Sequence, residues 1–278
     1  MKFIYASDIH GDIKKFEKLL NLSIQNNIKN IVFGGDLLPK KADKREPLQR
    51  EFINGYLKEF YKKLQEQDIN FIGILGNDDM EVVEKEYYTM IIQFPNIIDI
   101  DGKKADIDEV SFIGLNKVVD TPFMRKDHVV VEDGQEMPEQ FSEKILINGK
   151  YITVEEWRKM RENVIPKMED CLESLPKPTE GNKAIYVLHD PPAGIGLDNC
   201  FDGSKPGSKA IAKFLKNSNS YMSLHGHIHE AQKFSGVWNG KLGNTICIQA
   251  GQTEFGELPL HYVIVDTDRD YYEIGYEN

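Results

Sequence analysis

The sequence predicts a mixed α/β fold, and two observations support this. In the first half, short apolar runs alternate with amphipathic helical patterns, beginning with the run Phe3–Ala6, a helical pattern over 13–24, and the run Asn30–Phe33. This strand–helix–strand order implies parallel strands joined by right-handed crossovers. In the last third, strand patterns follow one another with few helices between them, so antiparallel pairing is expected there.

Length and composition indicate a globular protein with one sizeable core. The chain has 278 residues, 40% hydrophobic and 28% charged, and we expect a single domain over 1–278. The net charge of −11 argues against binding nucleic acid through a basic surface. Three cysteines without a CxxC pair argue against a disulfide scaffold or a zinc knuckle. No apolar run reaches the roughly 18 residues of a membrane span, and no signal-peptide pattern follows Met1, so the expected compartment is the cytoplasm.

The elements of the first half follow from hydrophobic periodicity. Asp12 is expected to cap the first helix, whose apolar face comprises Ile13, Phe16, Leu19, Leu20 and Ile24. Strands are expected at residues 3–6, 30–33, 70–75, 97–100 and 110–115, with helices at about 13–24, 47–65 and 80–93. The strand over 97–100 has the character of a sheet edge, and the one over 110–115 is a candidate for the start of a second sheet.

Residues 119–180 have a looser pattern than the rest of the chain. Within them, Thr153 and Glu156 form a capping box for a helix expected to run to about Leu175, before Pro176 and Pro178. We interpret this segment as a cap or insertion beside the functional site, not as an independent domain.

The last third predicts strands at 184–188, 220–224, 245–248, 261–265 and 272–276, with a short helix near 208–215. Asn239–Gly240 is a hairpin signal of the Asn-Gly type.

Three of the seven histidines lie within five positions, His225, His227 and His229, at the end of the strand over 220–224. Residues two apart in an extended chain share a face, so His227 and His229 can offer imidazoles to one point. The more specific interpretation is that these histidines bind a metal, since imidazole is the commonest metal ligand. Solvated histidines at a polar strand end are the alternative.

Other strands also end in potential metal ligands. They are Asp8 with His10, Asp36, Asn77, and His189. Carboxyl ends of parallel strands lie along one edge of a sheet, where sites form in open α/β folds. Each residue has a simpler explanation alone: Asp8 as a helix cap, Asp36 and Asn77 as turn residues, His189 as a loop histidine. The coincidence of all of them favours a metal site.

These blocks together resemble the calcineurin-like metallophosphoesterases. The matching motifs are DxH at Asp8–His10, GGD at 34–36, GND at 76–78, the single His189, and GHIH at 226–229. The resemblance implies a four-layer α/β/β/α sandwich of two mixed sheets. It also implies two divalent metal ions, one bound by Asp8, His10, Asp36 and His229 and the other by Asp36, Asn77, His189 and His227, with Asp36 bridging.

The implied activity is hydrolysis of a phosphate mono- or diester. Two ions sharing a carboxylate and a water lower the pKa of that water, and the metal-bridging hydroxide then attacks phosphorus in line. Mixed nitrogen and oxygen ligands suit manganese, iron or zinc. The expected substrate is a small phosphorylated molecule. A non-catalytic protein-interaction module on the same scaffold is the alternative.

One position departs from the family pattern. The third motif usually reads GNH, with a histidine that serves the leaving group or the phosphate, and here that position is Asp78. A carboxylate acts as a general acid only if its pKa is raised, and neighbouring metals lower it. Asp78 is therefore a candidate catalytic residue, with Asn77 and His189, or a residue that orients a water or an imidazole. Capping of the helix after Met80 is the structural alternative.

Further polar residues carry weaker expectations. Arg125 and Lys126 could hold a substrate phosphate, or could be a solvated surface pair. Asp190 could orient an imidazole or simply occupy a turn. For the remaining histidines, packing beneath the site is expected for His225, and a structural or exposed position for the other two, His128 and His261.

Overall fold

The computed structural model describes residues 1–41, 44–252 and 259–277. Within these ranges the chain forms two facing six-stranded sheets. The first contains, in spatial order, β16 (Tyr271–Glu277), β15 (Leu260–Asp266), β1 (Lys2–Ala6), β2 (Asn30–Gly34), β3 (Asn70–Ile74) and β4 (Ile97–Asp99). The second contains β13 (Asn239–Leu242), β14 (Thr245–Gln249), β12 (Met222–His225), β11 (Lys183–Leu188), β6 (Val110–Leu115) and β5 (Lys104–Ile107).

Both sheets are mixed, with parallel strands at their centres. Strands β1 to β4 run parallel, as do β6, β11, β12 and β14, whereas β5, β13, β15 and β16 pair antiparallel at the edges. The predicted antiparallel character of the C-terminal third is therefore confirmed for β13, β15 and β16. Strand β4 lies at an edge and β6 lies in the second sheet, as the sequence predicts.

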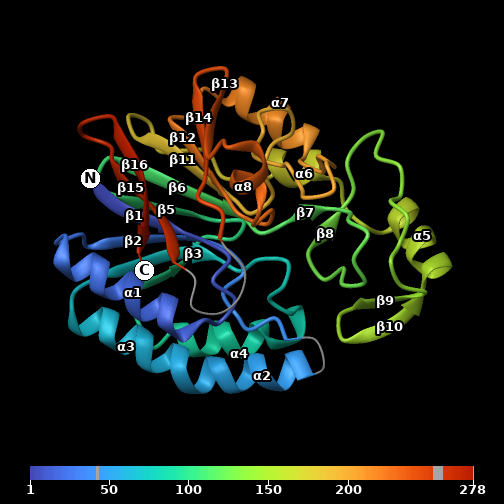
Figure 1. The fold of residues 1–278 in the computed structure, drawn as a ribbon, viewed down its shortest axis with the longest axis horizontal. Coiled ribbons are helices and arrows are strands. Elements are labelled where there is room, and N and C mark those ends of the chain that lie inside the picture. Colours follow the sequence, from blue (N-terminus) through green and yellow to red (C-terminus); the bar gives the residue numbers. More distant parts are fainter. Residues whose placement is uncertain (42–43, 253–258, 278) are drawn as a thin grey trace.

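Helices cover the outer face of each sheet and complete four layers (Figure 1). The helices on the side of the first sheet are α1 (Ile13–Gln25), α2 (Arg45–Phe52), the π-helical turn η2 (Ile53–Leu57), α3 (Lys58–Glu66) and α4 (Glu81–Ile91). Those on the side of the second are α6 (Met168–Glu173) and α7 (Lys209–Ser218), with the short α8 (Ala231–Ser235) near the strand ends. The α/β/β/α architecture implied by the family resemblance is confirmed.

The strands are apolar on both faces because each sheet is sandwiched. Between the sheets, the Phe3 and Phe112 rings pack edge to face with centroids 5.6 Å apart, beside Ile185 and Leu224. On the outer face of the first sheet, Phe33 and Phe71 stack at 5.4 Å beneath the helices. Continuous apolar runs, which look ambiguous in sequence, are the consequence of this double burial.

Two helical predictions need correction. The pattern over 47–65 is not one regular α-helix, since the π-helical turn η2 separates α2 from α3. In α1, which Asp12 caps by accepting from the backbone N–H groups of Lys14 and Lys15, the apolar face is narrower than expected. Ile13 and Ile24 are 48% and 45% exposed, because they lie at the margins of the buried stripe.

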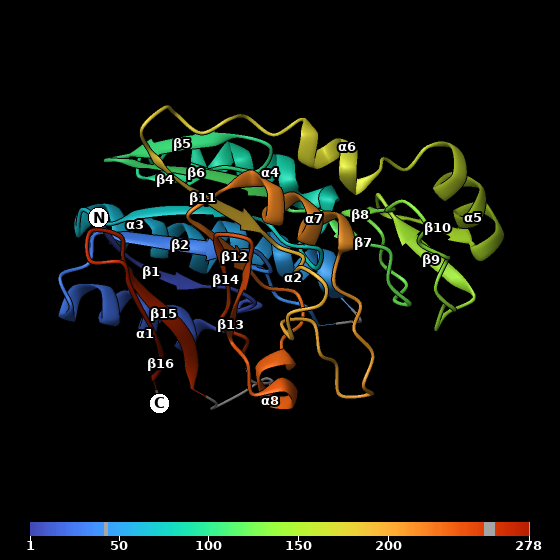
Figure 2. The same cartoon turned by 90° about the horizontal axis from the view of Figure 1, so that it is seen from above.

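Residues 119–180, called the insertion segment below, lie between β6 and β11 and are built from short elements. They are the paired β7 (Val118–Val119) and β8 (Val129–Val130), the hairpin of β9 (Lys144–Ile147) and β10 (Lys150–Thr153), the helix α5 (Val154–Asn163), and α6. Figure 1 and Figure 2 both show β9, β10 and α5 beyond the end of the two sheets.

The insertion segment has a small core of its own, in which Trp157 is fully buried. The predicted capping box of Thr153 and Glu156 is present, but the helix does not continue to Leu175. It ends at Asn163, and α6 starts only after Pro166, whose missing N–H and fixed φ oppose a continuous helix.

The hairpin signal at Asn239–Gly240 is also misplaced. These residues lie within β13, where they pair with Ile248 and Cys247, and the turn falls at residues 243–244. Gly243 has φ of +60° there, so a glycine three positions later supplies the turn. No helix in the described ranges combines the length and apolarity that crossing a membrane requires.

Candidate metal centre

The predicted ligands lie where five parallel strands end. Strands β1, β2 and β3 of the first sheet lead to Asp8, Asp36 and Asn77, and β11 and β12 of the second lead to His189 and His227. Backbone hydrogen bonds tie the following loops together. The Asp8 N–H donates to Gly35 at 2.9 Å, and the Gly226 N–H donates to His189 at 3.0 Å. These bonds join neighbouring turns within each sheet, and the His227 N–H, which donates to Asp8 Oδ1 at 2.9 Å, links the turns of the two sheets.

A first group of side chains forms a candidate metal site: Asp8, His10, Asp36 and His229. One ligand atom from each lies within 4.8 Å of the others. His229 Nε2 is 3.0 Å from His10 Nε2 and 3.3 Å from Asp8 Oδ1, and His10 Nε2 is 3.6 Å from Asp36 Oδ2. Two carboxylates and two imidazoles at these distances suit a borderline divalent cation.

A second group adjoins the first through Asp36. His189 Nε2 and His227 Nδ1 both approach Asn77 Oδ1, at 2.9 and 2.7 Å. His189 Nε2 is also 3.5 Å from Asp36 Oδ2, the same oxygen that faces His10. One carboxylate oxygen is therefore shared between two clusters of nitrogen and oxygen donors.

A family profile for the calcineurin-like phosphoesterases matches residues 1–231. The chain belongs to the calcineurin-like phosphoesterase family. No curated protein sequence gives a significant match. Among solved structures, one crystal structure superposes with a TM-score of 0.64 at 17% identity, over 100% of this chain and 99% of its own. The crystal structure of TT1561 from Thermus thermophilus gives 0.59 at 17% identity, over 99% and 98%. These likenesses concern the fold.

The turns that carry the ligands of this calcineurin-like phosphoesterase are not extended strand, which corrects the reasoning from alternation. Asp8, His10, Asp36 and His227 have positive φ, between 50° and 66°, and they are four of the ten non-glycine residues with positive φ in the described chain. Such backbone is costly for side chains other than glycine and tends to mark functional sites. His227 and His229 consequently point to different partners, not to one shared point.

Three glycines make room for the ligands. A Cβ on Gly35 would lie 2.5 Å from His189 Nδ1, and one on Gly226 would lie 2.5 Å from Asp8 Oδ2. A Cβ on Gly76 would lie 2.2 Å from both the backbone N and Oδ1 of Asp36. Each of these glycines precedes a candidate ligand, so the phosphoesterase motifs combine a ligand with the space it needs.

The His189 ring is held in one orientation. Its Nδ1 donates to the Gly34 carbonyl at 2.7 Å, which leaves Nε2 facing Asn77 and Asp36. This is the arrangement by which proteins orient a metal-binding imidazole.

The electrostatics of the site favour a cation. Burial opposes ionisation of Asp36, but His189 and His10 hold its pKa well below the usual range. Burial likewise disfavours a charged His189, yet the Asp36 carboxylate raises the pKa of that imidazole to about 10. Burial lowers the pKa of His10 to about 3 and of His227 to about 4. Near neutral pH an ionised Asp36 thus lies beside a protonated His189 and the neutral imidazoles of His10 and His227, and a cation bound at this position would take the place of the His189 proton.

Asp78 does not cap the following helix, and that alternative is wrong. Helix α4 starts at Glu81 with no side-chain cap at Met80. Burial and the charge of Asp36 raise the pKa of Asp78, but Lys40 and Arg45 reverse this and leave it lowered. Arg45 Nη1 donates to Asp78 Oδ1, and Lys40 Nζ lies 3.6 Å from Oδ2. An ionised, paired carboxylate is a poor proton donor.

Arg125 and Lys126 are separated by the structure. Arg125 Nε faces the Asp78 carboxylate at 3.9 Å. Lys126 is fully buried, 2.7 Å from Asp120 Oδ1, and also donates to the Thr121 carbonyl. The solvated surface pair is therefore wrong for both residues, and Lys126 does not face Asp78.

The remaining expectations concern residues behind the ligands. His225 is fully buried and its ring contacts the carbonyls of Leu188 and Asp190, which supports both loops as expected. The Asp190 carboxylate accepts from the Val119 N–H at 2.9 Å, so it supports the start of the insertion segment. His128 and His261 are buried, which fits their predicted structural position.

Two features have no counterpart among the sequence predictions. Asp79 accepts from the backbone N–H groups of Leu37, Leu38 and Gly76 at 2.7–3.0 Å, and so joins the loops that carry Asp36 and Asn77. Burial, with the charge of Asp36, raises its pKa to about 8. Arg45, which pairs with Asp78, lies among other charges of a polar stretch, and no local pattern distinguishes it.

Proposed function

We propose that this protein is a metal-dependent phosphoesterase that hydrolyses a phosphate mono- or diester with the help of two divalent cations. The observation that carries the proposal is the position of Asp36 Oδ2, 3.6 Å from His10 Nε2 and 3.5 Å from His189 Nε2. A carboxylate between two donor clusters is suited to bridge two cations.

The donor set assigns four ligands to each cation. One cation is held by Asp8, His10, Asp36 and His229, and the other by Asp36, Asn77, His189 and His227. Manganese, iron or zinc suits these mixed donors. When bound, the pair would activate a shared water as the nucleophile and offset charge on the phosphate oxygens.

The protein residues orient this chemistry. Asn77 contributes a neutral oxygen, so the site stays more cationic than a third carboxylate would allow. Its Oδ1 lies between His189 Nε2 and His227 Nδ1, at 2.9 and 2.7 Å, which supports its assignment to the second cluster. Asp78 is ionised and paired with Arg45, so its role is positioning, and a substrate with a good leaving group needs no acid there.

The insertion segment contributes to substrate binding as a cap on the single domain. Arg125 enters from this segment and faces Asp78, whose backbone N–H donates to Asp36 Oδ1 at 2.8 Å. A guanidinium beside the candidate cations is suited to a phosphate oxygen. The substrate is a small phosphorylated molecule.

The test uses Asp36→Asn and His189→Ala, with Asp202→Asn, an exposed aspartate, as the matched control. With manganese present, the unchanged protein should release 4-nitrophenol from 4-nitrophenyl phosphate or its bis-ester. Asp36→Asn and His189→Ala should each lower that rate on the order of a thousandfold and reduce bound metal by elemental analysis. Asp202→Asn should change neither.

Absence of hydrolysis with metal bound would overturn the enzyme proposal. It would favour a binding module on the phosphoesterase scaffold, a role for which Asp78 in place of the usual histidine is the motivating observation. Circular dichroism of each variant separates loss of the site from loss of the fold.

A further inference from the structure

The surroundings of Asp78 are unusually rich in positive charge. Three cationic side chains face this one carboxylate: Arg45 through a hydrogen bond, Lys40 at 3.6 Å and Arg125 at 3.9 Å. All are largely buried, with side-chain exposures of 14%, 25% and 11% for the cations and 19% for Asp78. Burial and the proximity of Arg45 lower the pKa of Arg125.

Arg45 and Arg125 also have N–H groups that make no hydrogen bond within the described residues. Arg45 Nε, Arg125 Nε and Arg125 Nη1 are buried and have no hydrogen-bond partner among the described residues. The other carboxylate near Arg125, Asp127, accepts from the backbone N–H groups of Glu81 and Asn148. A buried donor without an acceptor is destabilising, and an anionic ligand would supply that acceptor.

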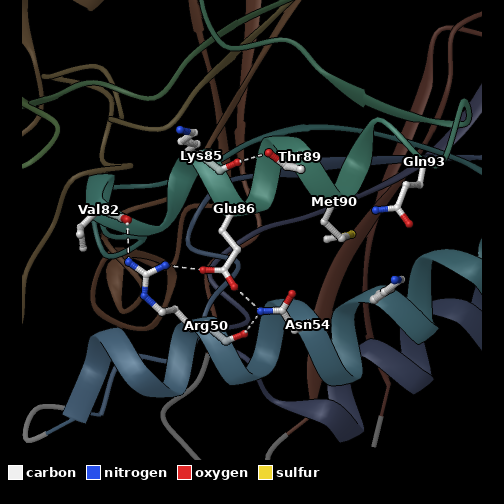
Figure 3. A pocket seen from close by; sticks show the side chains of 9 residues that line it. Arg50, Asn54, Val82, Lys85, Glu86, Thr89, Met90 and Gln93 are labelled. Atoms are coloured by element: carbon white, nitrogen blue, oxygen red, sulfur yellow. Dashed lines mark hydrogen bonds and ion pairs between the residues drawn. The ribbon is translucent and has the colours of Figure 1, made fainter.

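Arg50, which lies further along α2, is an arginine whose guanidinium has several hydrogen-bond acceptors. It lines a pocket of about 450 Å³ between α2 and α4, shown in Figure 3. Its guanidinium donates to Glu46 at 3.0 Å, to Glu86, and to the Val82 carbonyl at 3.0 Å. Two carboxylates accept from one arginine in that pocket, whereas two arginines face one carboxylate at Asp78.

The charged cluster adjoins the candidate metal centre. The Asp78 N–H donates to Asp36 Oδ1 at 2.8 Å, and Lys40 Nζ lies 3.4 Å from His10 Nε2. An anion bound by Arg45 and Arg125 would therefore lie next to a phosphate placed at the metals, within reach of one small molecule.

We propose that Arg45 and Arg125, aligned by Asp78, bind a second phosphate of the substrate, so that the preferred substrates carry two phosphate groups. This rests on the proposed function, since the first phosphate is the one hydrolysed at the metals. Two guanidinium groups face the single Asp78 carboxylate, and the guanidinium fork presents paired N–H groups to phosphate oxygens. Asp78 acts as a positioning residue, because it touches the arginines rather than the reacting atoms.

The first measurement tests the cluster without catalysis. Binding of inorganic phosphate to metal-free protein is followed by calorimetry for the unchanged chain, Arg45→Gln, Arg125→Gln and the control Arg50→Gln. Each of the first two substitutions should weaken phosphate binding about tenfold, the loss of one charge-assisted hydrogen bond, and Arg50→Gln should not. Equal binding by all four proteins would overturn the proposal.

The second measurement compares adenosine 3′,5′-bisphosphate with adenosine 5′-monophosphate and 4-nitrophenyl phosphate in the presence of manganese. Arg45→Gln and Arg125→Gln should raise KM for the bisphosphate about tenfold, a clearly larger increase than for the two monophosphates, and the control Arg50→Gln should change neither. Asp78→Asn should raise KM for the bisphosphate by a larger factor than it changes kcat.

Equal losses on bisphosphate and monophosphates would overturn the second-phosphate assignment, because the arginines would then hold the phosphate that reacts. Phosphate binding that depends on Arg45 and Arg125, without hydrolysis of any ester, would retain the anion site and overturn the proposed enzyme. The two proposals therefore fail through different results.

Discussion

The two sides of the candidate site are held in place by different means. On the sheet side, each loop places a ligand within three residues of a strand end, at Asp8, Asp36, Asn77, His189 and His227. On the other side, Arg125 comes from the insertion segment, whose strands β7 and β8 have two residues each. The ligands are positioned by sheet hydrogen bonds, whereas Arg125 depends on a small core and a few polar anchors. This difference indicates that metal binding and substrate binding can be disturbed separately.

The largest expected effect in free energy is on the insertion segment. Trp157→Ala removes a fully buried indole and its 3.2 Å hydrogen bond to Asp120, and should destabilise the segment by about 3–5 kcal/mol. Bound metal should not change, because the candidate ligands lie outside residues 119–180. Urea unfolding and elemental analysis measure the two quantities.

Tyr151→Ala is the matched control for this substitution. Tyr151 lies in the same segment and is 64% exposed, so its loss should cost under about 0.5 kcal/mol. Loss of metal in Trp157→Ala at a temperature where the sheets stay folded would show that the two sides are not separable.

The next largest effect is expected on the sheet side, where the structure leaves no room for one added methyl group at Gly76. In Gly76→Ala the new Cβ would lie 2.2 Å from the Asp36 backbone N, which cannot move without displacing the shared ligand. A displacement of about 1 Å should lower hydrolysis roughly a hundredfold. Bound metal should fall in parallel, as measured by elemental analysis.

Gly55→Ala serves as the control, since a Cβ there would meet nothing within 4 Å. It should leave hydrolysis and metal content unchanged. A Gly76→Ala protein with full activity would mean that the loop geometry is not what holds Asp36.

The same contrast explains what could be predicted from sequence. The side chains that the structure brings together at the strand ends could be named from sequence, because most of them follow an apolar strand directly; their role as metal ligands stays a prediction. Their geometry was not, since His227 adopts φ of 66° in place of extended backbone and points to Asn77, away from the His229 partners. Positive φ in histidine and aspartate leaves no mark in periodicity.

In the insertion segment, prediction failed for a different reason. Lys126 has the sequence context of a surface charge, and only contact with Asp120, six residues away, shows why it is buried. The role of Arg45 was equally hidden, because its partner Asp78 is 33 residues distant. Pairing between distant charges is a property of the fold, and no single-sequence pattern contains it.

A smaller effect is expected where the segment joins the sheet. Asp190→Ala removes the acceptor of the Val119 N–H, and a buried donor without a partner costs about 1–3 kcal/mol. Burial raises the pKa of Asp190, and an asparagine at this position keeps a side-chain oxygen that can accept from the Val119 N–H. Asp190→Asn should therefore retain most of the stability that Asp190→Ala loses. Thermal unfolding of the two variants checks this, and equal losses would contradict it.

The smallest effect lies at Glu84 on α4, whose Oε1 is 3.4 Å from the insertion segment's His128. Burial raises the pKa of Glu84 from 4.5 to about 7. The folded state therefore keeps a proton that the unfolded chain releases, so this group's contribution to stability is full below about pH 4.5 and is lost as pH rises to about 7. His128 acts in the opposite direction, because burial lowers its pKa from 6.5 to about 3 and stability is lost as pH falls through that range.

Glu84→Gln removes the first of these two dependences and leaves the second. With metal removed by chelation, the variant should be more stable than the unchanged protein at about pH 8, by less than about 1 kcal/mol because Glu84 is partly solvated. Near pH 4.5 the two proteins should unfold at similar urea concentrations. A stability difference that does not vary with pH would contradict this prediction. It would show that packing, not the charge of Glu84, determines how the contact with His128 contributes to the free energy of unfolding.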